Sequence, residues 1–197
     1  MKELKKGVTL MVPANNEEPR IEKFLKQFES YVDAILVVND GSTDKTVEIA
    51  EKYADKVIQL DSKKLPKPSH QVQIYNEGLK HVETEWILTA DCDEVWDVGF
   101  LKNLKEIMAK YPDVMSFRFP RCNLPDGKDF PDYQNRLVKT EWVIWKGEPH
   151  IVPHMRAEIV GEGEVVEQPL DTISCETLDE YPIVHLPRRK DLRRPWW

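Results

Sequence analysis

The segment Trp86-Ile-Leu-Thr-Ala-Asp-Cys-Asp-Glu94 joins a short apolar run to a cluster of carboxylates. The apolar residues that begin it are typical of a strand covered on both faces, as in a parallel sheet. Open α/β sheets bind their ligands at the carboxyl ends of such strands. Because Asp91, Asp93 and Glu94 repel one another unless a cation lies among them, the segment favours a divalent-metal site. A solvated acidic turn explains the same residues when they are taken alone.

Length and composition are those of a soluble globular protein with one domain. The 197 residues are enough for one sizeable core, and 41% of them are hydrophobic and 32% charged. The net charge of −7 argues against a nucleic-acid partner, since phosphate binding needs a basic face. No apolar run approaches the roughly 20 residues that cross a bilayer, and residues 1–6 lack a signal-peptide core. We therefore expect a cytoplasmic protein.

The first hundred residues alternate between strand and helix patterns. Short apolar runs predict strands at 7–12, 34–38, 57–60 and 86–88. Between these strands, apolar residues recur with helical spacing over 21–28, 47–54 and 72–82. The first helix is expected to have Asn16 as its N-terminal cap. This alternation predicts an α/β fold with a mostly parallel mixed sheet flanked by helices.

After residue 98 the pattern becomes loop-rich. Residues 101–108 have helical spacing, and Met115, Phe117 and Phe119 alternate as in a half-exposed strand. Further short strands are predicted near 136–138, 142–145 and 157–160. Because no internal repeat or low-complexity linker separates the two parts, we expect them to be halves of one domain.

Polar residues directly follow three of the predicted strands. These segments are 13–17 (Pro-Ala-Asn-Asn-Glu), 39–42 (Asn-Asp-Gly-Ser) and 91–94 (Asp-Cys-Asp-Glu). In a parallel sheet all three lie at one edge and could line one crevice. A turn or a helix cap explains each segment alone, but not their arrival at successive strand ends. One interpretation is that Asp40 accepts hydrogen bonds from a nucleobase or ribose, while a metal at Asp93 neutralises a diphosphate.

Taken in order, these segments resemble the motifs of family 2 glycosyltransferases with the GT-A fold, and the resemblance covers residues 8–97. It implies that the first two motifs hold the nucleoside of a nucleoside diphosphate sugar. The corresponding residues here are Pro13, Ala14, Asn16, Glu17 and Asp40. Asn15 replaces the usual aromatic residue and Asn39 the usual acid, which leaves the preference for a nucleobase open.

The third segment matches the Asp-x-Asp element of that family. The resemblance implies that Asp91 faces the ribose and that Asp93 binds Mn²⁺ or Mg²⁺ on the diphosphate. Cys92 occupies the middle position of the element and is included among the nucleotide-sugar-binding residues.

In the second half the resemblance is confined to two short elements. Phe130-Pro-Asp-Tyr-Gln-Asn-Arg-Leu137 resembles the element that carries the catalytic base, with Pro131 in place of the usual Glu. It implies that Asp132 takes the proton of the acceptor hydroxyl. Asp129 and Glu148 are alternatives, and an ordinary Asp in a turn is another.

Gly147-Glu-Pro-His150 resembles the second element, in which the family has a histidine. The resemblance implies that His150 completes the metal shell, and imidazole is a more common ligand of Mn²⁺ than of Mg²⁺. His154 and His185 compete for this role, and a purely structural histidine is the other interpretation.

The resemblance implies a metal-dependent, inverting glycosyltransferase that transfers a sugar from a nucleoside diphosphate sugar to a glycan, glycoprotein or lipid-linked acceptor. A non-catalytic sugar-nucleotide or glycan-binding module is the alternative, because Pro131 interrupts the base motif and the acceptor half is short. A nucleotidyltransferase is less favoured, since no glycine-rich basic loop follows the first strand. On this interpretation one domain over 1–197 has a donor half (1–97), an acceptor half (98–187) and a basic tail (188–197). The tail could contact an anionic membrane surface, bind a partner or be a disordered terminus.

Overall fold

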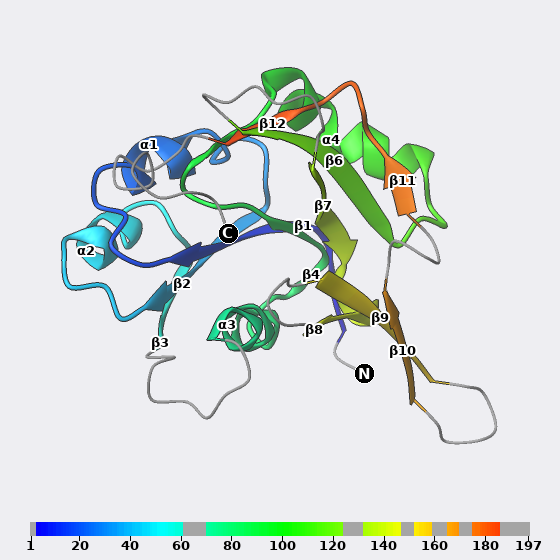
Figure 1. Cartoon of the computed structure of the whole chain (residues 1–197), viewed down its shortest axis with the longest axis horizontal. Coiled ribbons are helices and arrows are strands. Elements are labelled where there is room, and N and C mark those ends of the chain that lie inside the picture. Colours follow the sequence, from blue (N-terminus) through cyan, green and yellow to red (C-terminus); the bar gives the residue numbers. More distant parts are fainter. Residues whose placement is uncertain are drawn as a thin grey trace.

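The computed structural model describes residues 3–60, 70–123, 132–146, 152–158, 165–169 and 175–185, and Figure 1 shows their arrangement. The elements in chain order are β1 (Lys5–Ala14), α1 (Ile21–Lys26), β2 (Ala34–Asp40), α2 (Thr46–Ala50), β3 (Lys56–Leu60), α3 (His70–Leu79), β4 (Thr84–Thr89), β5 (Glu94–Val95), α4 (Val98–Lys110), β6 (Ser116–Asn123), β7 (Asp132–Lys139), the 3-10 helix η2 (Thr140–Trp142), β8 (Val143–Lys146), β9 (Val152–Glu158), β10 (Val165–Pro169), β11 (Cys175–Thr177) and β12 (Ile183–His185). All four strands predicted in the first half are confirmed, each inside a slightly longer strand.

One large sheet carries most of the strands, in the order β3-β2-β1-β4-β7-β6-β12-β5, with β11 beside β6. Strands β3, β2, β1 and β4 are parallel, so that Leu10 pairs with Ile35 on one side and with Leu88 on the other. Strand β7 runs antiparallel to both β4 and β6. The predicted mixed, mostly parallel sheet is confirmed, and the carboxyl ends of β1, β2 and β4 lie at one edge.

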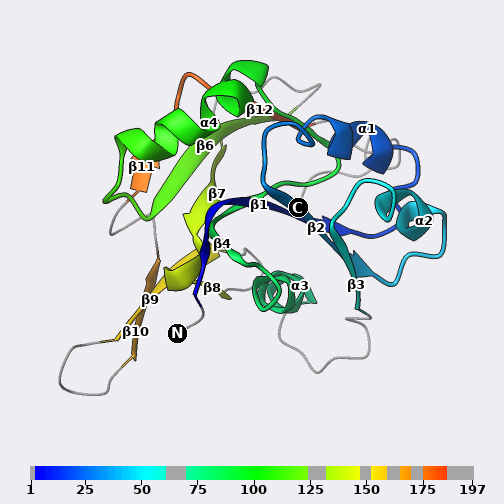
Figure 2. The ribbon, with the colours of Figure 1, turned by 180° about the vertical axis from the view of Figure 1, so that it is seen from behind.

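Helices cover both faces of this sheet, as Figures 1 and 2 show. On one face, Val8, Leu10 and Val12 of β1 share a buried cluster with α1, α2 and Phe100 of α4. On the other face, Met11 shares a second cluster with α3 and β8. Alternate residues of β1 therefore pack into two different cores, as expected of a central strand in an α/β sheet.

Helix α1 carries the predicted apolar stripe but begins later than predicted. The stripe residues are all buried, namely Ile21, Phe24 and Leu25 in α1 and Phe28 in the turn that follows it. The prediction that Asn16 caps this helix is wrong, because Arg20 is the residue that precedes the first helical turn. Asn16 instead has a φ of 55°, in the left-handed region. Asparagine is favoured both at helix caps and in this region, so composition alone does not separate the two.

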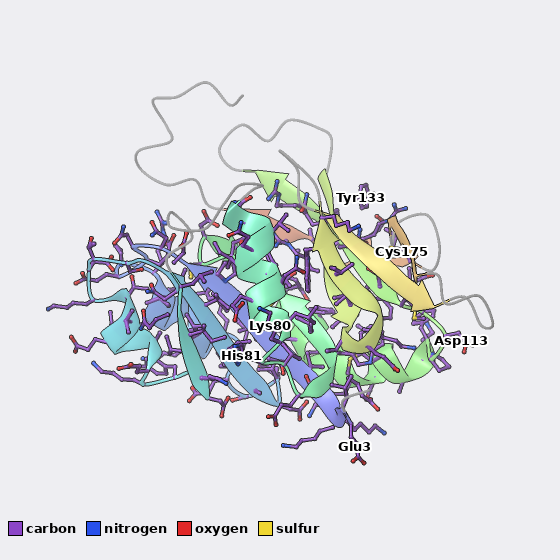
Figure 3. All side chains as sticks on the ribbon, turned by 90° about the horizontal axis from the view of Figure 1, so that it is seen from below. Glu3, Lys80, His81, Asp113, Tyr133 and Cys175 are labelled. Carbon is purple, nitrogen blue, oxygen red and sulfur yellow. The ribbon has the colours of Figure 1, made fainter. Side chains whose placement is uncertain are left out.

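Helix α3 lies close to the sheet because it presents a glycine to it. A Cβ added at Gly78 would contact Met11 Sδ and lie 3.0 Å from Val38 Cγ2. Figure 3 shows α3 lying across the strands, with Lys80 and His81 at its carboxyl end. The close approach at Gly78 sets how near the other residues of α3 lie to the sheet edge.

The second half adds antiparallel structure that the sequence predicted only in part. Phe117 and Phe119 of β6 are fully buried, as predicted. The strand is not half-exposed as predicted, because Ser116 and Pro120 are buried as well, and Met115 lies just before the strand. The predicted strands near 136–138 and 142–145 lie largely in β7 and β8, whereas the segment 157–160 overlaps only the end of β9. Strands β8, β9 and β10 form a separate antiparallel sheet that was not predicted.

The helices in the described part of the chain are short. The longest of them, α4, has 13 residues. Within the described ranges, no helix combines the length and the apolar composition that a membrane crossing requires.

Candidate functional site

A pocket of about 390 Å³ lies at the edge where β1, β2 and β4 end. Residues predicted to bind the donor or the metal form much of its lining: Pro13, Ala14, Glu17, Asp40, Asp91, Cys92 and Asp93. They come from three separate strand ends, which the parallel pairing brings side by side. The geometry supports the expected crevice, and the binding of a nucleotide sugar by these residues stays a prediction.

Asn16, which the sequence also predicted as a binding residue, is not among the lining residues and instead joins two loops. Its backbone N–H donates to Ser42 Oγ at 2.9 Å, and its Oδ1 accepts from the Thr43 N–H at 2.8 Å. The next N–H, of Glu17, donates to Thr46 Oγ1 at 2.7 Å. These bonds hold the segment after β1 against the segment after β2, so the two parts of the pocket wall have a fixed relative position.

Glu17 and Asn15, which both line the pocket, each form a hydrogen bond with a nearby residue. Glu17 is only 2% exposed, and its Oε2 receives a hydrogen bond from Arg20 Nη1 at 3.1 Å. A buried carboxylate without such a cation would be costly. Asn15 stands where an aromatic residue was expected, and its side-chain amide donates to the backbone carbonyl of Asp40. The residue that replaces the aromatic side chain thus fixes the backbone of Asp40 at the pocket.

Helix α3 forms a wall of the pocket that the sequence analysis missed. Gln71, Ile74 and Tyr75 line this side. Tyr75 stacks on the Trp145 ring, with 5.3 Å between ring centroids and 25° between planes. Burial raises the pKa of the Tyr75 hydroxyl, and the Asp91 carboxylate raises it further, so the phenol stays neutral. Trp145 is 3% exposed, which agrees with a core position for this aromatic residue.

The acid cluster after β4 contains a cation that comes from the protein itself. Arg136 of β7 donates from Nη2 to Asp91 Oδ2 at 2.8 Å, and the same nitrogen donates to Glu94. Arg136 is only 5% exposed. Mutual repulsion among the acids was the reason to expect a metal, and Arg136 relieves part of that repulsion. Asp91 and Asp93, which line the pocket, are therefore the side chains that would hold a metal.

Glu94 lies beneath the pocket and organises the turn after β4. Its Oε2 accepts hydrogen bonds from the Asp91 N–H at 3.1 Å and from Trp96 Nε1 at 3.3 Å. Burial raises the pKa of Glu94, although the Arg136 guanidinium opposes the rise. Because Glu94 is 1% exposed and is not a lining residue, we assign it a structural part in the site.

The carboxylates of Asp91 and Asp93 fit a divalent cation that is shared with a bound diphosphate. Both residues line the pocket, and Mg²⁺ or Mn²⁺ sites of this kind use one or two carboxylates with phosphate oxygens and water. Within the described residues, no group of three or more His, Cys, Asp or Glu side chains could hold a metal alone. His150 lies outside the described residues, and only the backbone is described for His154 and His185.

The predicted base, Asp132, begins β7, where it pairs with Arg121 of β6. Its side chain lies outside the described residues, as do Asp129, Glu148 and the basic tail 188–197. Because β7 runs antiparallel to β4, the start of β7 lies at the edge where β4 ends. Figure 3 shows this orientation, since Tyr133 near the start of β7 lies at the end of the sheet opposite Glu3.

A larger hollow of about 920 Å³ lies at the opposite edge, where β1 and β4 begin. Charged groups of its lining already have partners, since Lys105 Nζ donates to Asp33 Oδ1 at 2.7 Å and Lys139 Nζ donates to the Pro112 carbonyl at 2.6 Å. None of the predicted site residues lines this hollow. Because open α/β sheets bind ligands at the carboxyl ends of strands, the smaller pocket is the candidate site.

Comparison with known proteins points to one enzyme family. A sequence profile described as glycosyl transferase family 2 matches residues 9–157. The dolichyl-phosphate beta-glucosyltransferase ALG5D of Trichomonas vaginalis is 29% identical over 116 residues, which are 51% of this chain and 36% of that protein. The chain spans about a third of the length of the first curated relatives that it matches.

Many solved structures resemble the chain in fold, and two of them serve for comparison. S. aureus TarS in complex with UDP-GlcNAc has a TM-score of 0.63 at 16% identity, covering 100% of this chain and 62% of that one. Glucosyl-3-phosphoglycerate synthase from Mycobacterium tuberculosis, in complex with Mn²⁺, UDP and phosphoglyceric acid, has a TM-score of 0.54 at 16% identity, covering 69% of this chain and 56% of that one. At these identities the likeness shows a shared fold.

Proposed function

Because the chain belongs to glycosyl transferase family 2 and has the GT-A fold, we propose that it transfers a sugar from a nucleoside diphosphate sugar to an acceptor hydroxyl. The proposed reaction depends on a divalent metal and inverts the configuration at the anomeric carbon. Since the chain spans only part of its curated relatives, the proposal concerns the reaction at the pocket described above.

One observation carries the proposal. Polar side chains from the ends of three neighbouring strands share one pocket, with Glu17 and Asp40 from the ends of β1 and β2 and Asp91 and Asp93 from the end of β4. The first pair offers acceptors for the N–H and O–H groups of a nucleoside, and the second pair offers ligands for a cation on the diphosphate. This division of the pocket matches the two ends of a nucleoside diphosphate sugar.

Asp93 and Asp91 would hold the metal. When bound there, a divalent cation would neutralise the negative charge of the diphosphate and the charge that develops on the leaving group. Arg136 occupies Oδ2 of Asp91, so Oδ1 is the oxygen of Asp91 that faces the metal and the donor in this proposal. Asp93 is 9% exposed and lines the pocket, which makes it the main ligand in this proposal.

Transfer needs a base on the acceptor side of the pocket. The acceptor oxygen attacks the anomeric carbon, the bond from that carbon to the diphosphate oxygen breaks, and the nucleoside diphosphate leaves. We assign the proton of the acceptor hydroxyl to the Asp132 carboxylate, because β7 begins at the same edge of the sheet at which β4 ends. A single displacement of this kind inverts the anomeric configuration.

UDP sugars are the first donors to test, because the S. aureus and M. tuberculosis structures hold UDP-GlcNAc or UDP. The T. vaginalis relative is named for dolichyl phosphate, so a lipid-linked phosphate belongs in the acceptor screen beside hydroxyl acceptors. Only the hydroxyl acceptors test the proposed base, because an ionised phosphate oxygen has no proton to lose. Asn15 and Asn39 depart from the family pattern, so GDP, TDP and CMP sugars belong in the same screen.

A thermal-shift screen with and without Mn²⁺ tests donor binding, because a ligand that binds the folded state raises its stability. Product formation with the best donor then tests transfer in the wild type, in Asp93→Ala and in Asp132→Ala. Glu106→Ala removes an exposed carboxylate from α4 and serves as the control, for which we expect wild-type turnover.

We expect no turnover in Asp93→Ala and at least roughly 100-fold slower turnover in Asp132→Ala, the usual loss when a general base is removed. Unchanged turnover in Asp93→Ala would exclude the metal role. Donor binding by the wild type without any transfer would favour the non-catalytic sugar-nucleotide module instead.

A further inference from the structure

We propose that Arg136 is a positioning residue of the donor site, which holds the Asp91 carboxylate in the orientation that binds the donor, with Glu94 as its anchor. This inference rests on the proposed donor binding at the pocket. The residues predicted for this site lie in the first half of the chain, except for the predicted metal ligand His150 and the predicted base Asp132. Arg136 adds a further contribution from the second half.

The contact between Arg136 and Asp91 joins β7 to the turn after β4. Arg136 Nη2 lies 2.8 Å from Asp91 Oδ2, and the two residues are 45 positions apart in the sequence. The Asp91 side chain is 35% exposed, whereas the Arg136 side chain is 6% exposed. The carboxylate therefore faces the pocket, and the guanidinium supports it from the protein interior.

Glu94 closes this contact into a ring of hydrogen bonds. Arg136 Nη2 also donates to Glu94 Oε1, while Glu94 Oε2 accepts from the backbone N–H of Asp91. Asp91 is thus held at two points, its side chain by Arg136 and its backbone by Glu94. A carboxylate with both its backbone and its side chain tied loses little further conformational freedom when a ligand binds.

The backbone of β7 is irregular at Arg136. Leu137 pairs with Phe117 of β6 and Asn135 pairs with Arg118, so Arg136 is the extra residue between two successive pairs. Such a bulge redirects a side chain, and bulges are frequent next to binding sites. The Arg136 carbonyl remains held, because Thr89 Oγ1 of β4 donates to it at 3.2 Å.

Lysine at this position would not reproduce the arrangement. One nitrogen, Nη2, donates to both carboxylates, and the planar guanidinium fixes its position, whereas an ammonium is a mobile point charge on a flexible chain. Among the residues that the structure describes, Arg136 Nε is buried without a hydrogen-bond partner, so the ring depends on Nη2. Arg136→Lys therefore keeps the positive charge but removes the planar group that fixes the direction of the two hydrogen bonds.

The test measures UDP affinity by calorimetry with Mn²⁺ present, together with KM and kcat for the donor. Arg136→Lys is expected to weaken UDP binding by roughly 10- to 100-fold, the usual cost of removing a partner that orients a ligand-binding side chain. Donor KM is expected to rise by a similar factor, with a smaller change in kcat. Asp91→Asn is expected to weaken UDP binding as well, and the double variant to lose little beyond the larger single loss.

Lys139→Ala is the matched control, because Lys139 is also a cation of β7 but donates to Pro112 at the far edge of the sheet. It can lower the midpoint of thermal unfolding, but is expected to leave UDP affinity unchanged. Glu94→Gln provides a second variant if Arg136→Lys does not fold, and is expected to weaken UDP binding several-fold.

The outcomes separate this inference from the proposed function. If the wild type binds UDP with Mn²⁺ and folded Arg136→Lys or Glu94→Gln binds it equally well, Arg136 has only a structural role and the inference is wrong. If the wild type binds none of the nucleoside diphosphates tested, the proposed function fails and the inference fails with it.

Discussion

Asn76 and Trp145 hold each other through two hydrogen bonds that run in opposite directions. Asn76 Nδ2 donates to the Trp145 carbonyl oxygen at 2.9 Å, and the Trp145 N–H donates to Asn76 Oδ1 at 3.0 Å. The pair joins α3 to β8, while the neighbouring Tyr75 stacks on the Trp145 ring and lines the pocket. Helix α3 is therefore fixed between the large sheet and the small antiparallel sheet.

Asn76→Ala is expected to lower the free energy of unfolding by about 2–3 kcal/mol, because it leaves two polar groups of the buried Trp145 without partners. Urea denaturation measures the change. Lys80→Ala removes an exposed ion pair with Glu77 just after the same helix, and is expected to change stability by less than about 0.5 kcal/mol. Equal losses in the two variants would contradict the importance of the Asn76 contact.

Gly7→Ala is expected to be more harmful than Gly41→Ala, although both glycines have positive φ, at 141° and 64°. A Cβ at Gly7 would lie 2.7 Å from Asp33 Oδ2, whereas nothing lies within 4 Å of one at Gly41. Asp33 cannot easily move away, because it accepts hydrogen bonds from the Val8 N–H and from Lys105.

Gly41→Ala should therefore cost only the backbone strain, about 1–2 kcal/mol. Gly7→Ala should cost a further 1–3 kcal/mol or so for the crowding against Asp33. Thermal unfolding of the two variants under one condition measures the difference. Equal midpoints would mean that Asp33 moves aside at little cost.

The parts of the fold that could be predicted from the sequence are those with a local signature. Strand β4 and the stripe on α1 were predicted because apolar residues recur there with the period of one element. Strands β5, β11 and β12 have two or three residues each, which is too short for any period to appear. They are strands because residues far away in the chain pair with them.

The candidate site divides in the same way. Asp40, Asp91 and Asp93 were predicted because each lies at or shortly after the end of a strand, and they do line one pocket. The contribution of Arg136 was missed, since it depends on β7 lying beside β4 and on a bulge in the pairing with β6. The apolar spacing predicted Tyr75 only as a residue on the buried face of a helix. Its position at the pocket depends on how that helix packs in the folded protein.

Asp33 should make the free energy of unfolding depend on pH under acidic conditions. Burial alone would raise the pKa of Asp33, but hydrogen bonds from Lys105 and the Val8 N–H outweigh it, so the pKa lies below its ordinary value of 3.8. A depressed carboxyl pKa stabilises the folded state above the unfolded value, and this contribution is lost as the pH falls through the folded pKa.

Asp33→Asn is therefore expected to be less stable than the wild type at pH 7, with a difference of at most about 1 kcal/mol because the group is partly solvated. The difference should shrink as the pH falls below the ordinary value of 3.8. Urea titrations from pH 7 to about pH 2.5 measure it. A difference that stays constant over this range would assign the effect to a neutral hydrogen bond.

Variants of Asn16 test whether its side chain holds the loops after β1 and β2 together or binds the nucleotide. Its left-handed φ and its acceptor bond to the Thr43 N–H are both features that Asp can reproduce. Asn16→Asp should therefore stay near wild-type stability, whereas Asn16→Ala should lose about 1–2 kcal/mol through backbone strain and a further contribution through the lost bond. Asn16→Gly relieves the strain and should fall between them.

UDP affinity in the same three variants separates the two roles of Asn16. If Asn16 only joins the loops after β1 and β2, affinity should follow stability, with Asn16→Asp close to the wild type and Asn16→Ala the weakest binder. If its side-chain amide contacts the nucleotide, as the family resemblance implied, Asn16→Asp and Asn16→Gly should both bind weakly while remaining well folded. The position of Ser42 and Thr43 around Asn16 favours the first result, because these hydrogen bonds already engage its side-chain oxygen and its backbone N–H.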